Sequence, residues 1–153
     1  MRDTIREATP ADVPALEIVR RQAVEATYAE FTDRSVYADA VASADPALPA
    51  WIDDPNWLVL VFETRVTPVA YAAVDCDRGR LVALYTAPDY RRRGYARRIV
   101  TTLQERLREQ GESVLDAVVP VAVEPFFRAV GFDRVGSPST DEIPTVPMQA
   151  SLP

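Results

Sequence analysis

Apolar residues in the first part of the chain recur at helical spacing. Between residues 9 and 28 they stand three or four positions apart, as on one face of an α-helix. Thr9 precedes this segment as a capping residue, and Pro10 suits the first helical turn. We therefore predict a helix over residues 9–28 whose inner face is formed by Val13, Leu16, Val19, Ala23 and Ala26.

The pattern then becomes less regular and afterwards strand-like. Residues 35–45 fit a second helix, and the prolines of residues 45–57 favour a loop or a short helix. Residues 57–63, 69–75 and 80–86 are short apolar runs separated by turn-forming sequences, and they predict three consecutive antiparallel strands. Because these runs are apolar at nearly every position, both faces of the sheet should be covered.

Helical spacing returns in the second half of the chain. Residues 95–110 carry an apolar stripe and are followed by Gly111, a common residue after a helix C-terminus. Beyond it, residues 113–120 predict a strand, residues 123–130 a short helix, and residues 145–153 a last strand weakened by its prolines. This order of elements predicts a mixed α/β domain.

The composition is that of a globular protein. The chain has 153 residues, of which 48% are hydrophobic and 26% charged. Its longest apolar run is strand-sized, which argues against a membrane span, and its first residues lack the apolar centre of a secretion signal. Cys76 is the only cysteine and histidine is absent, so we expect no disulfide, no metal site and a cytoplasmic location.

Two residue types are missing altogether. Without histidine there is no histidine-based triad, and without lysine there is neither a Walker lysine nor Schiff-base chemistry. All 17 basic residues are arginine, while the formal net charge at pH 7 is −6. This balance argues against general nucleic-acid binding and favours cationic partners.

The sequence APDYRRRGYARR, residues 87–98, runs against this acidic balance. Its arginines surround Gly94, between a predicted strand ending near Thr86 and a predicted helix starting near Tyr95. A helix N-terminus offers backbone N–H groups and a partial positive charge, and glycine lets a ligand approach the backbone closely. The arrangement favours pyrophosphate binding at a strand–loop–helix junction. On spacing alone, a solvated arginine face explains it equally well.

The spacing Arg-x-x-Gly-x-Ala, from Arg91 to Ala96, resembles the acetyl-CoA loop of the GNAT superfamily of N-acetyltransferases. The preceding LYTAPDYR is similar to the strand and the proline-containing lead-in of that family. PFFRAVGF, residues 125–132, resembles its late helix, and IREATPADVPAL resembles its usual opening. The resemblance covers nearly the whole chain, and residues 81–132 carry its specific part.

The resemblance implies an α+β fold with a mixed, mostly antiparallel central sheet flanked by helices, in one domain over residues 1–153. It implies an acetyltransferase that moves the acetyl group of acetyl-CoA, a co-substrate, to an amine by direct attack and without a metal. The acceptor would be a small-molecule or peptidyl amine, with no nucleic-acid or membrane partner, and a homodimer is compatible with the family. The net charge adds the expectation that this amine is cationic before it reacts.

The implied acetyl-CoA site lies in a cleft where the strand ending at Thr86 and the strand over residues 113–120 splay apart. A backbone N–H near Tyr85 would stabilise the developing oxyanion. The residues that the resemblance assigns to acetyl-CoA are Leu84, Tyr85, Thr86, Arg91, Arg92, Arg93, Gly94, Tyr95, Ala96 and Arg97.

The catalytic positions depart from the family pattern. Many members carry a tyrosine where this chain has Phe127, and an asparagine where it has Pro120. Arg80 occupies the region in which some members carry a glutamate base. In the absence of histidine, a base must be a carboxylate or a water chain. The carboxylates that position suggests are Asp75 first, and then Glu30 and Asp33.

Two further classes of function stay open. A non-catalytic acyl-CoA-binding domain, acting as a sensor or scaffold, would explain the missing tyrosine and base, and turnover with amines would separate it from an enzyme. An anion- or nucleic-acid-binding module would use the arginine loop without preferring CoA, and its affinity would fall steeply with salt. The acidic remainder of the chain argues against such a module.

Overall fold

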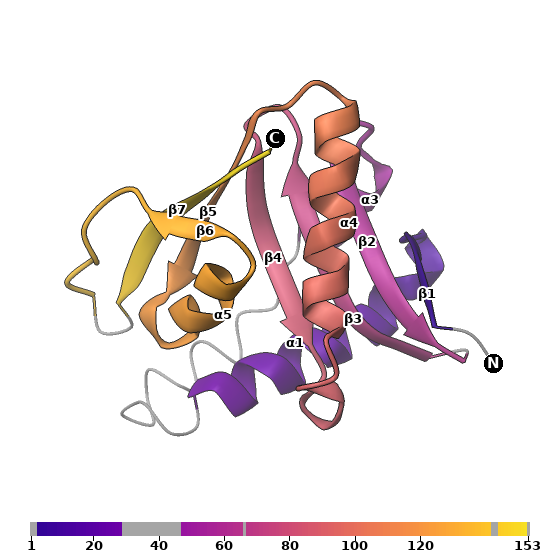
Figure 1. The fold of residues 1–153 in the computed structure, drawn as a ribbon. Helices are drawn as coiled ribbons and strands as arrows, with labels where there is room; N and C mark the ends of the chain where they lie inside the picture. The colour runs from indigo at the N-terminus through magenta and orange to yellow at the C-terminus, as the bar shows by residue number, and fades with distance from the viewer. Residues whose placement is uncertain (1–2, 29–46, 66, 142–143, 153) are drawn as a thin grey trace.

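A seven-stranded sheet organises the chain in a computed structural model, which describes residues 3–28, 47–65, 67–141 and 144–152 (Figure 1). The strands follow the order β1-β2-β3-β4-β5-β7-β6. Each neighbouring pair is antiparallel except β4 and β5, which are parallel. The expected mixed, mostly antiparallel sheet flanked by helices is therefore confirmed.

The helices of the first part follow the sequence pattern. Helix α1 (Val13–Tyr28) comes directly after a short 3₁₀ turn, η1 (Pro10–Asp12), so the helix predicted from residue 9 is confirmed. The segment predicted as a loop or short helix contains the short helix α3 (Leu48–Asp53). The second helix predicted over residues 35–45 lies outside the described residues.

The three predicted strands are confirmed as a continuous antiparallel meander. They are β2 (Trp57–Thr64), β3 (Thr67–Asp75) and β4 (Arg80–Thr86). Strand β1 (Thr4–Glu7) adds to the outer edge of β2, and the sequence pattern did not reveal it. Its four residues are too few to show a clear alternation of apolar and polar positions.

The second half of the chain supplies the remaining elements. Helix α4 (Tyr95–Glu109), strand β5 (Val114–Pro120), helix α5 (Glu124–Ala129) and strand β7 (Thr145–Ser151) all fall within the predicted segments. The three-residue strand β6 (Phe132–Arg134) was not predicted and pairs with β7 at the far edge.

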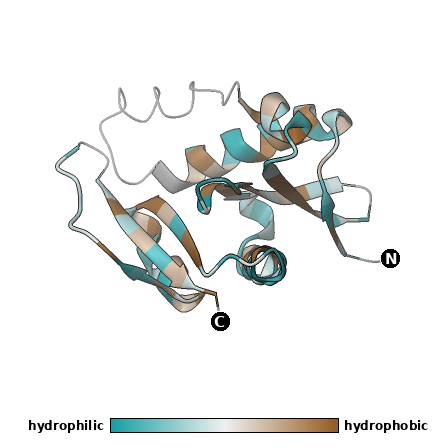
Figure 2. Cartoon of the chain, turned by 90° about the horizontal axis from the view of Figure 1, so that it is seen from above, coloured by the Kyte–Doolittle hydropathy of each residue, from teal (hydrophilic) through white to brown (hydrophobic). Residues whose placement is uncertain are grey.

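Helices cover both faces of the sheet, because side chains of the central strands alternate between two apolar clusters. On one face, Ile99 and Leu103 of α4 belong to the same cluster as Leu60 of β2. On the other face, Leu16 of α1 belongs to a cluster with Val61 of β2. Figures 1 and 2 show α4 on one side of the sheet and α1 and α3 on the other. The prediction of a sheet buried on both faces is confirmed.

Strands β4 and β5 are in register over only two positions, at Arg80 and Leu81 of β4. Toward the C-terminal end of β4 the two strands diverge, as Figure 1 shows. A bulge marks the point of divergence: the pairing of β3 with β4 skips Val82, between Leu81 and Ala83. The sheet is therefore open at its middle, between two strands that would otherwise be neighbours.

Two ion-pair clusters hold peripheral elements in place. Arg6 of β1 donates to Asp12 of η1 at 2.8 Å and to Glu63 of β2 at 3.2 Å. Glu124, at the start of α5, accepts hydrogen bonds of 2.6 and 2.7 Å from Arg134 of β6. Hydrogen bonds from these arginines lower the pKa of Asp12 and the pKa of Glu124, each to about 2. Both carboxylates therefore stay charged at neutral pH and act as structural anchors.

Candidate active site

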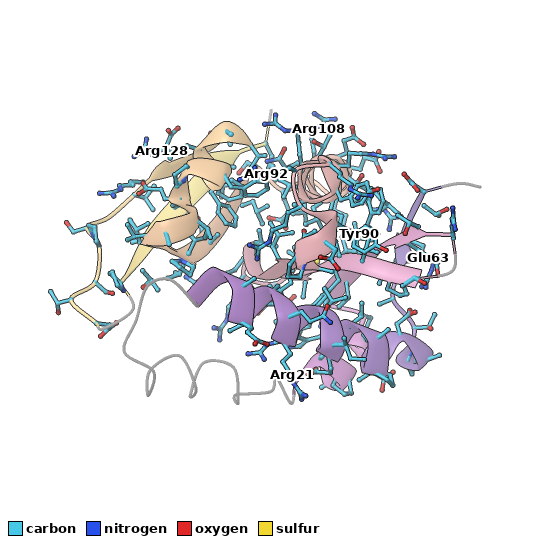
Figure 3. All side chains as sticks on the ribbon, turned by 90° about the horizontal axis from the view of Figure 1, so that it is seen from below. Arg21, Glu63, Tyr90, Arg92, Arg108 and Arg128 are labelled. Carbon is cyan, nitrogen blue, oxygen red and sulfur yellow. The ribbon has the colours of Figure 1, made fainter. Side chains whose placement is uncertain are left out.

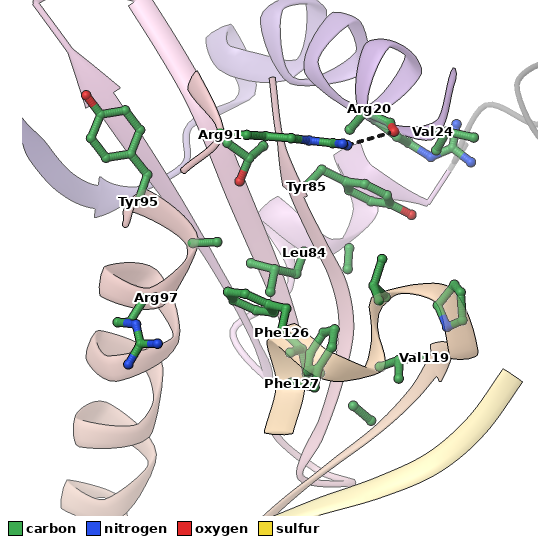
Figure 4. A pocket seen from close by; sticks show the side chains of 18 of the residues that line it. Arg20, Val24, Leu84, Tyr85, Arg91, Tyr95, Arg97, Val119, Phe126 and Phe127 are labelled. Carbon is green, nitrogen blue, oxygen red and sulfur yellow. Dashed lines mark hydrogen bonds between the residues drawn. The ribbon is translucent and has the colours of Figure 1, made fainter. Parts of the chain in front are cut away.

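A cavity of about 770 Å³ opens where β4 and β5 diverge (Figure 4). Five elements line it: β4, β5, the C-terminal half of α1, the N-terminus of α4, and α5 with the residues just before it. Its volume falls in the range of small-molecule and cofactor sites. The splayed strands that the family resemblance implied are thus present.

The loop in front of α4 presents backbone N–H groups at the cavity. The first helical hydrogen bond of α4 runs from the Arg98 N–H to the Gly94 carbonyl, at 3.0 Å. The N–H groups of Tyr95, Ala96 and Arg97 therefore precede the helical ladder, as at every α-helix N-terminus. All three of these residues and Gly94 line the cavity. An anion placed here would meet N–H donors and the positive end of the helix dipole.

Gly94 leaves room for a ligand beside the backbone. It has a φ of +79°, in the left-handed region that favours glycine. No atom lies within 4 Å of the position that a Cβ would take at Gly94. Arg92, two residues earlier, is also left-handed, with a φ of +65°. The chain therefore accepts unfavourable backbone geometry at the place where the sequence predicts phosphate binding.

Three arginines of the loop lie at the cavity. Arg92 and Arg97 line it beside the N-terminus of α4. Arg91 lines it as well and reaches across to α1, where Nη2 donates to the carbonyl oxygen of Ala23 at 3.2 Å (Figure 4). Charged donors thus lie on two sides of the space in front of the helix.

The side chains of the other two arginines, Arg93 and Arg98, pack on aromatic rings. The Arg93 guanidinium lies over the ring of Tyr90, 5.2 Å from its centroid, and Arg93 does not line the cavity. Arg98 lies over the ring of Phe62, 4.9 Å from its centroid. The resemblance assigns Arg93 to acetyl-CoA through its backbone amide, and the Arg93 side chain, packed over the Tyr90 ring, lies outside the cavity. The arginine run is not one continuous binding surface.

The alternation of β4 decides which backbone groups face the cavity. The Ala87 N–H donates to the Val69 carbonyl of β3 at 2.8 Å. Because the polar groups of successive residues point to opposite sides of a strand, the Tyr85 N–H also points toward β3. The N–H groups of Leu84 and Thr86 point the other way, toward the cavity. The expectation that the Tyr85 backbone N–H is catalytic is therefore corrected, because this N–H points to β3 and away from the cavity.

Helix α1 closes the cavity on the side away from α4. Arg20, Ala23 and Val24 of α1 line it there. Arg20 is only 9% exposed, and its guanidinium carbon lies 5.8 Å from the centroid of the Tyr85 ring. The Tyr85 side chain belongs to the apolar cluster under α1, so it lies on the same side. This wall of the cavity therefore combines a buried cation with an aromatic ring.

Sequence analysis did not single out Arg20, although a signal was present. Arg20 stands four residues after Leu16 and three before Ala23, on the predicted apolar face of α1. An arginine within such a face is unusual, because buried charges require partners. The aliphatic lining from β5, including Val118 and Val119, carried no comparable signal.

Helix α5 supplies an aromatic wall. Phe126 and Phe127 both line the cavity, and Phe127 is 7% exposed. Phe127 packs edge-to-face against Phe126 and Phe132, with ring centroids 5.3 and 5.4 Å away. Pro120 also lines the cavity, where many family members carry asparagine. Position 127 therefore places a ring beside the cavity without a hydroxyl group.

Asp75 is not brought to the cavity. It lies at the β3–β4 turn, where Oδ1 accepts the N–H groups of Asp77 at 3.1 Å and Arg78 at 3.4 Å. Because β3 runs antiparallel to β4, the end of β3 lies beside Arg80, at the opposite end of β4 from the arginine loop. The suggestion that Asp75 is a general base is corrected accordingly: its carboxylate stabilises a turn.

The other suggested bases, Glu30 and Asp33, lie outside the described residues. In the described part of the chain, no group of three or more His, Cys, Asp or Glu residues lies together as a metal site would require. No helix in that part is long and apolar enough to cross a membrane. Among the described residues, no Asp or Glu lines the cavity. The charged residues that line it there are all arginines: Arg20, Arg91, Arg92 and Arg97.

Solved structures share this fold along nearly their whole length. The PaiA N-acetyltransferase from Thermoplasma acidophilum, in complex with coenzyme A, has a TM-score of 0.84 at 17% identity, with 99% of each chain covered. A phosphinothricin acetyltransferase from Sinorhizobium meliloti, in complex with acetyl-CoA, has a TM-score of 0.69 at 20% identity, covering 99% of this chain and 89% of that one. A ribosomal-protein-alanine N-acetyltransferase from Brucella melitensis has a TM-score of 0.69 at 26% identity, covering 97% and 99%.

Sequence comparison agrees with the structural one. A search of curated proteins gives no significant match. The profile of the acetyltransferase (GNAT) domain, however, matches residues 20–152, which include α1 from Arg20 onward, the arginine loop and the last strands. Fold, cavity and profile lead to one conclusion: the chain belongs to the GNAT family of acetyltransferases.

Proposed function

We propose that this acetyltransferase holds acetyl-CoA in the cavity between β4 and β5, and that an amine attacks the bound thioester there directly. One observation carries the proposal. The cavity extends from the edge of β4 to the N-terminus of α4, where Gly94 leaves the backbone accessible. A ligand that is strand-like at one end and anionic at the other fits such a space.

The anionic end of the ligand fits the start of α4. The N–H groups of Tyr95, Ala96 and Arg97 would hold the pyrophosphate, with the Arg92 side chain beside them. The open position at Gly94 gives the phosphate oxygens access to the backbone. The same N–H groups cannot pair within the helix, so a phosphate satisfies donors that otherwise require water.

The pantetheine arm fits the free edge of β4. Leu84 and Thr86 point their backbone groups into the cavity, so an amide-bearing chain can add to this edge as a further strand would. Phe126, Phe127 and Val119 supply apolar walls on the opposite side. These walls keep water away from the ligand and strengthen polar contacts inside the cavity.

The protein's own contribution is orientation and one electrostatic contact. Acetyl-CoA supplies an activated thioester. The Leu84 N–H would donate to its carbonyl oxygen as negative charge develops there. Holding both reactants in one cavity replaces a bimolecular encounter by a positioned one. The described lining holds no carboxylate, and water at the cavity mouth would take up the proton that the amine loses.

Binding and turnover test this proposal separately. CoA should raise the melting temperature, and at a hundredfold excess over its Kd the stabilisation should be about 2.7 kcal/mol. Release of free CoA thiol from acetyl-CoA should then depend on added amine. The chain has no lysine, so acetylation of its own side-chain amines cannot obscure the measurement. Binding without amine-dependent release would instead favour the non-catalytic alternative.

A further inference from the structure

The cavity has two ends, one on each face of the sheet. Leu84 packs against the apolar cluster that contains α4, whereas Tyr85 packs against the cluster that contains α1. Residues of α4 and α5 line the cavity on the first face, and Arg20, Ala23 and Val24 line it on the second. The opening between β4 and β5 therefore connects the two faces.

The two ends suit the two substrates. The phosphate loop and Gly94 belong to the face covered by α4, so acetyl-CoA occupies that end if the proposed function holds. Direct attack requires the amine to be present at the same time, on a side that the CoA chain does not fill. The remaining end is the one bounded by α1 and the Tyr85 ring. The acceptor would therefore bind at this end of the cavity, beside Arg20.

Arg20 gives this end a fixed positive charge. The residue is 9% exposed, and its guanidinium carbon lies 5.8 Å from the centroid of the Tyr85 ring. A buried guanidinium keeps its position through contacts with protein groups, so its charge is held at this end of the cavity. A guanidinium presents five N–H donors in one plane, so it can hold a carboxylate while it also contacts protein groups. Its neighbour Arg21 is exposed on the outer side of α1 (Figure 3).

We infer that the acceptor is an amine that also carries a carboxylate, and that Arg20 is the residue that selects it. The inference rests on the proposed function and specifies its substrate class. The net charge of −6 predicted a cationic acceptor, but the charges that line the described part of the cavity are all positive. A positive field also favours the neutral form of the attacking amine, because it lowers the pKa of an ammonium group. The positive field of the described lining thus assists deprotonation of the amine.

Matched acceptors test the inference. Amino acids with one to four carbons between amine and carboxylate would each be compared with the corresponding carboxamide. The preference is the ratio of the two kcat/KM values, measured for the wild type, for Arg20→Gln and for the control Arg21→Gln. Comparing this ratio between proteins cancels the intrinsic difference in amine reactivity. The KM for acetyl-CoA, measured in each protein, reports whether the variant also disturbs the other end of the cavity.

The expected result is a preference for the carboxylate-bearing member that falls about 10- to 100-fold in Arg20→Gln, the range for a hydrogen bond between charged groups. Arg21→Gln should keep the wild-type preference, and Arg20→Gln should keep the wild-type KM for acetyl-CoA. Turnover confined to amines without an anionic group, or a preference that survives Arg20→Gln, would overturn this inference and leave the proposed function intact. A lost preference accompanied by a raised KM for acetyl-CoA would overturn it too, by assigning Arg20 to the CoA end. Absence of turnover with every amine would overturn both.

Discussion

Arg91 and Ala23 join the two walls of the cavity: the Arg91 guanidinium donates a 3.2 Å hydrogen bond to the Ala23 carbonyl oxygen. Arg91 opens the Arg-x-x-Gly-x-Ala spacing of the phosphate loop, and Ala23 lies on α1, one turn after Arg20. The side chain at the start of the loop therefore holds the helix on which the proposed acceptor site is built. The two proposed substrate sites share a structural support.

Replacing Arg91 should consequently affect the acceptor. Arg91→Met removes the hydrogen bond to the Ala23 carbonyl, worth about 1 kcal/mol, so the KM for the acceptor should rise about fivefold at saturating acetyl-CoA. Arg93→Met is the matched control, because it removes the same charge from the same loop but from outside the cavity. Steady-state kinetics measure both. Equal effects in the two variants would mean that only the charge of the loop matters.

Gly94 offers a sharper test of phosphate binding. Gly94→Val should abolish the thermal shift caused by CoA, since the new side chain fills the open space beside the helix start. It should also lower stability by about 1–2 kcal/mol, because a branched residue is strained at positive φ. Gly111, at the other end of α4, has a φ of +88° and equally open surroundings. Gly111→Val should show the same loss of stability and a normal CoA shift. A normal shift in Gly94→Val would refute the assignment of the loop.

Phe127 should matter less than the family pattern suggests. The leaving thiolate comes from a thiol with a pKa of about 8.5, so it can depart as the anion near neutral pH. An alkyl amine, with a pKa of about 10.4, needs more help to lose its proton. We expect Phe127→Tyr to change kcat by less than about tenfold, at the low end of general-acid catalysis. Phe126→Tyr controls for the added hydroxyl. A large gain in Phe127→Tyr alone would identify the wild type as a binding domain that lacks its chemistry.

Acid should destabilise the protein through two carboxylates. Hydrogen bonds from Arg6 and Arg134 lower the pKa of Asp12 and the pKa of Glu124 to about 2 in the folded state. In the unfolded chain these groups take up protons at their ordinary pKa values, near 4. Between about pH 4 and pH 2 the unfolded state therefore binds more protons, and the free energy of unfolding falls as the pH falls. Above that window the contribution is complete.

Urea unfolding at a series of pH values measures this effect. Glu124→Gln should be less stable than the wild type at pH 7, because Arg134 loses its charged partner. It should also lose less stability than the wild type between pH 4 and pH 2. Parallel curves for the two proteins would show that Glu124 takes no part in the acid response.

The central strands of the sheet were more predictable from the sequence than its two edge strands. Residues 57–63, 69–75 and 80–86 lie in the middle of the sheet, where burial on both faces demands apolar residues at nearly every position. Strands β1 and β6 lie at the two edges and have four and three residues, so they leave almost no periodic signal. Local pattern reveals an element only when the element is long enough to repeat it.

The site was predictable where spacing along the chain decides it. Gly94 and its neighbours form one local structure, so their spacing along the chain predicted the junction between β4 and α4. The choice between Tyr85 and Leu84 depends instead on which residues pair with β3, and the sequence does not state that register. Asp75 was misplaced for a similar reason: β3 and β4 are antiparallel, so the C-terminal end of β3 lies beside the N-terminal end of β4 and far from the arginine loop. The position of Arg20 at the cavity depends on how α1 packs across β4, which the sequence pattern does not state.

The pairing of β4 with β5 at only two positions also separates the sheet into two parts. Strands β1–β4 form one lobe and strands β5, β7 and β6 with α5 form another, and the pairing of β4 with β5 joins them at Arg80 and Leu81. We expect so short a junction to let the two lobes move relative to each other about Arg80 and Leu81, which would open and close the cavity. A ligand that bonds to both lobes should then hold them in one arrangement and stiffen the sheet. The stiffness of the sheet would therefore depend on the ligand bound between the two lobes as well as on the protein itself.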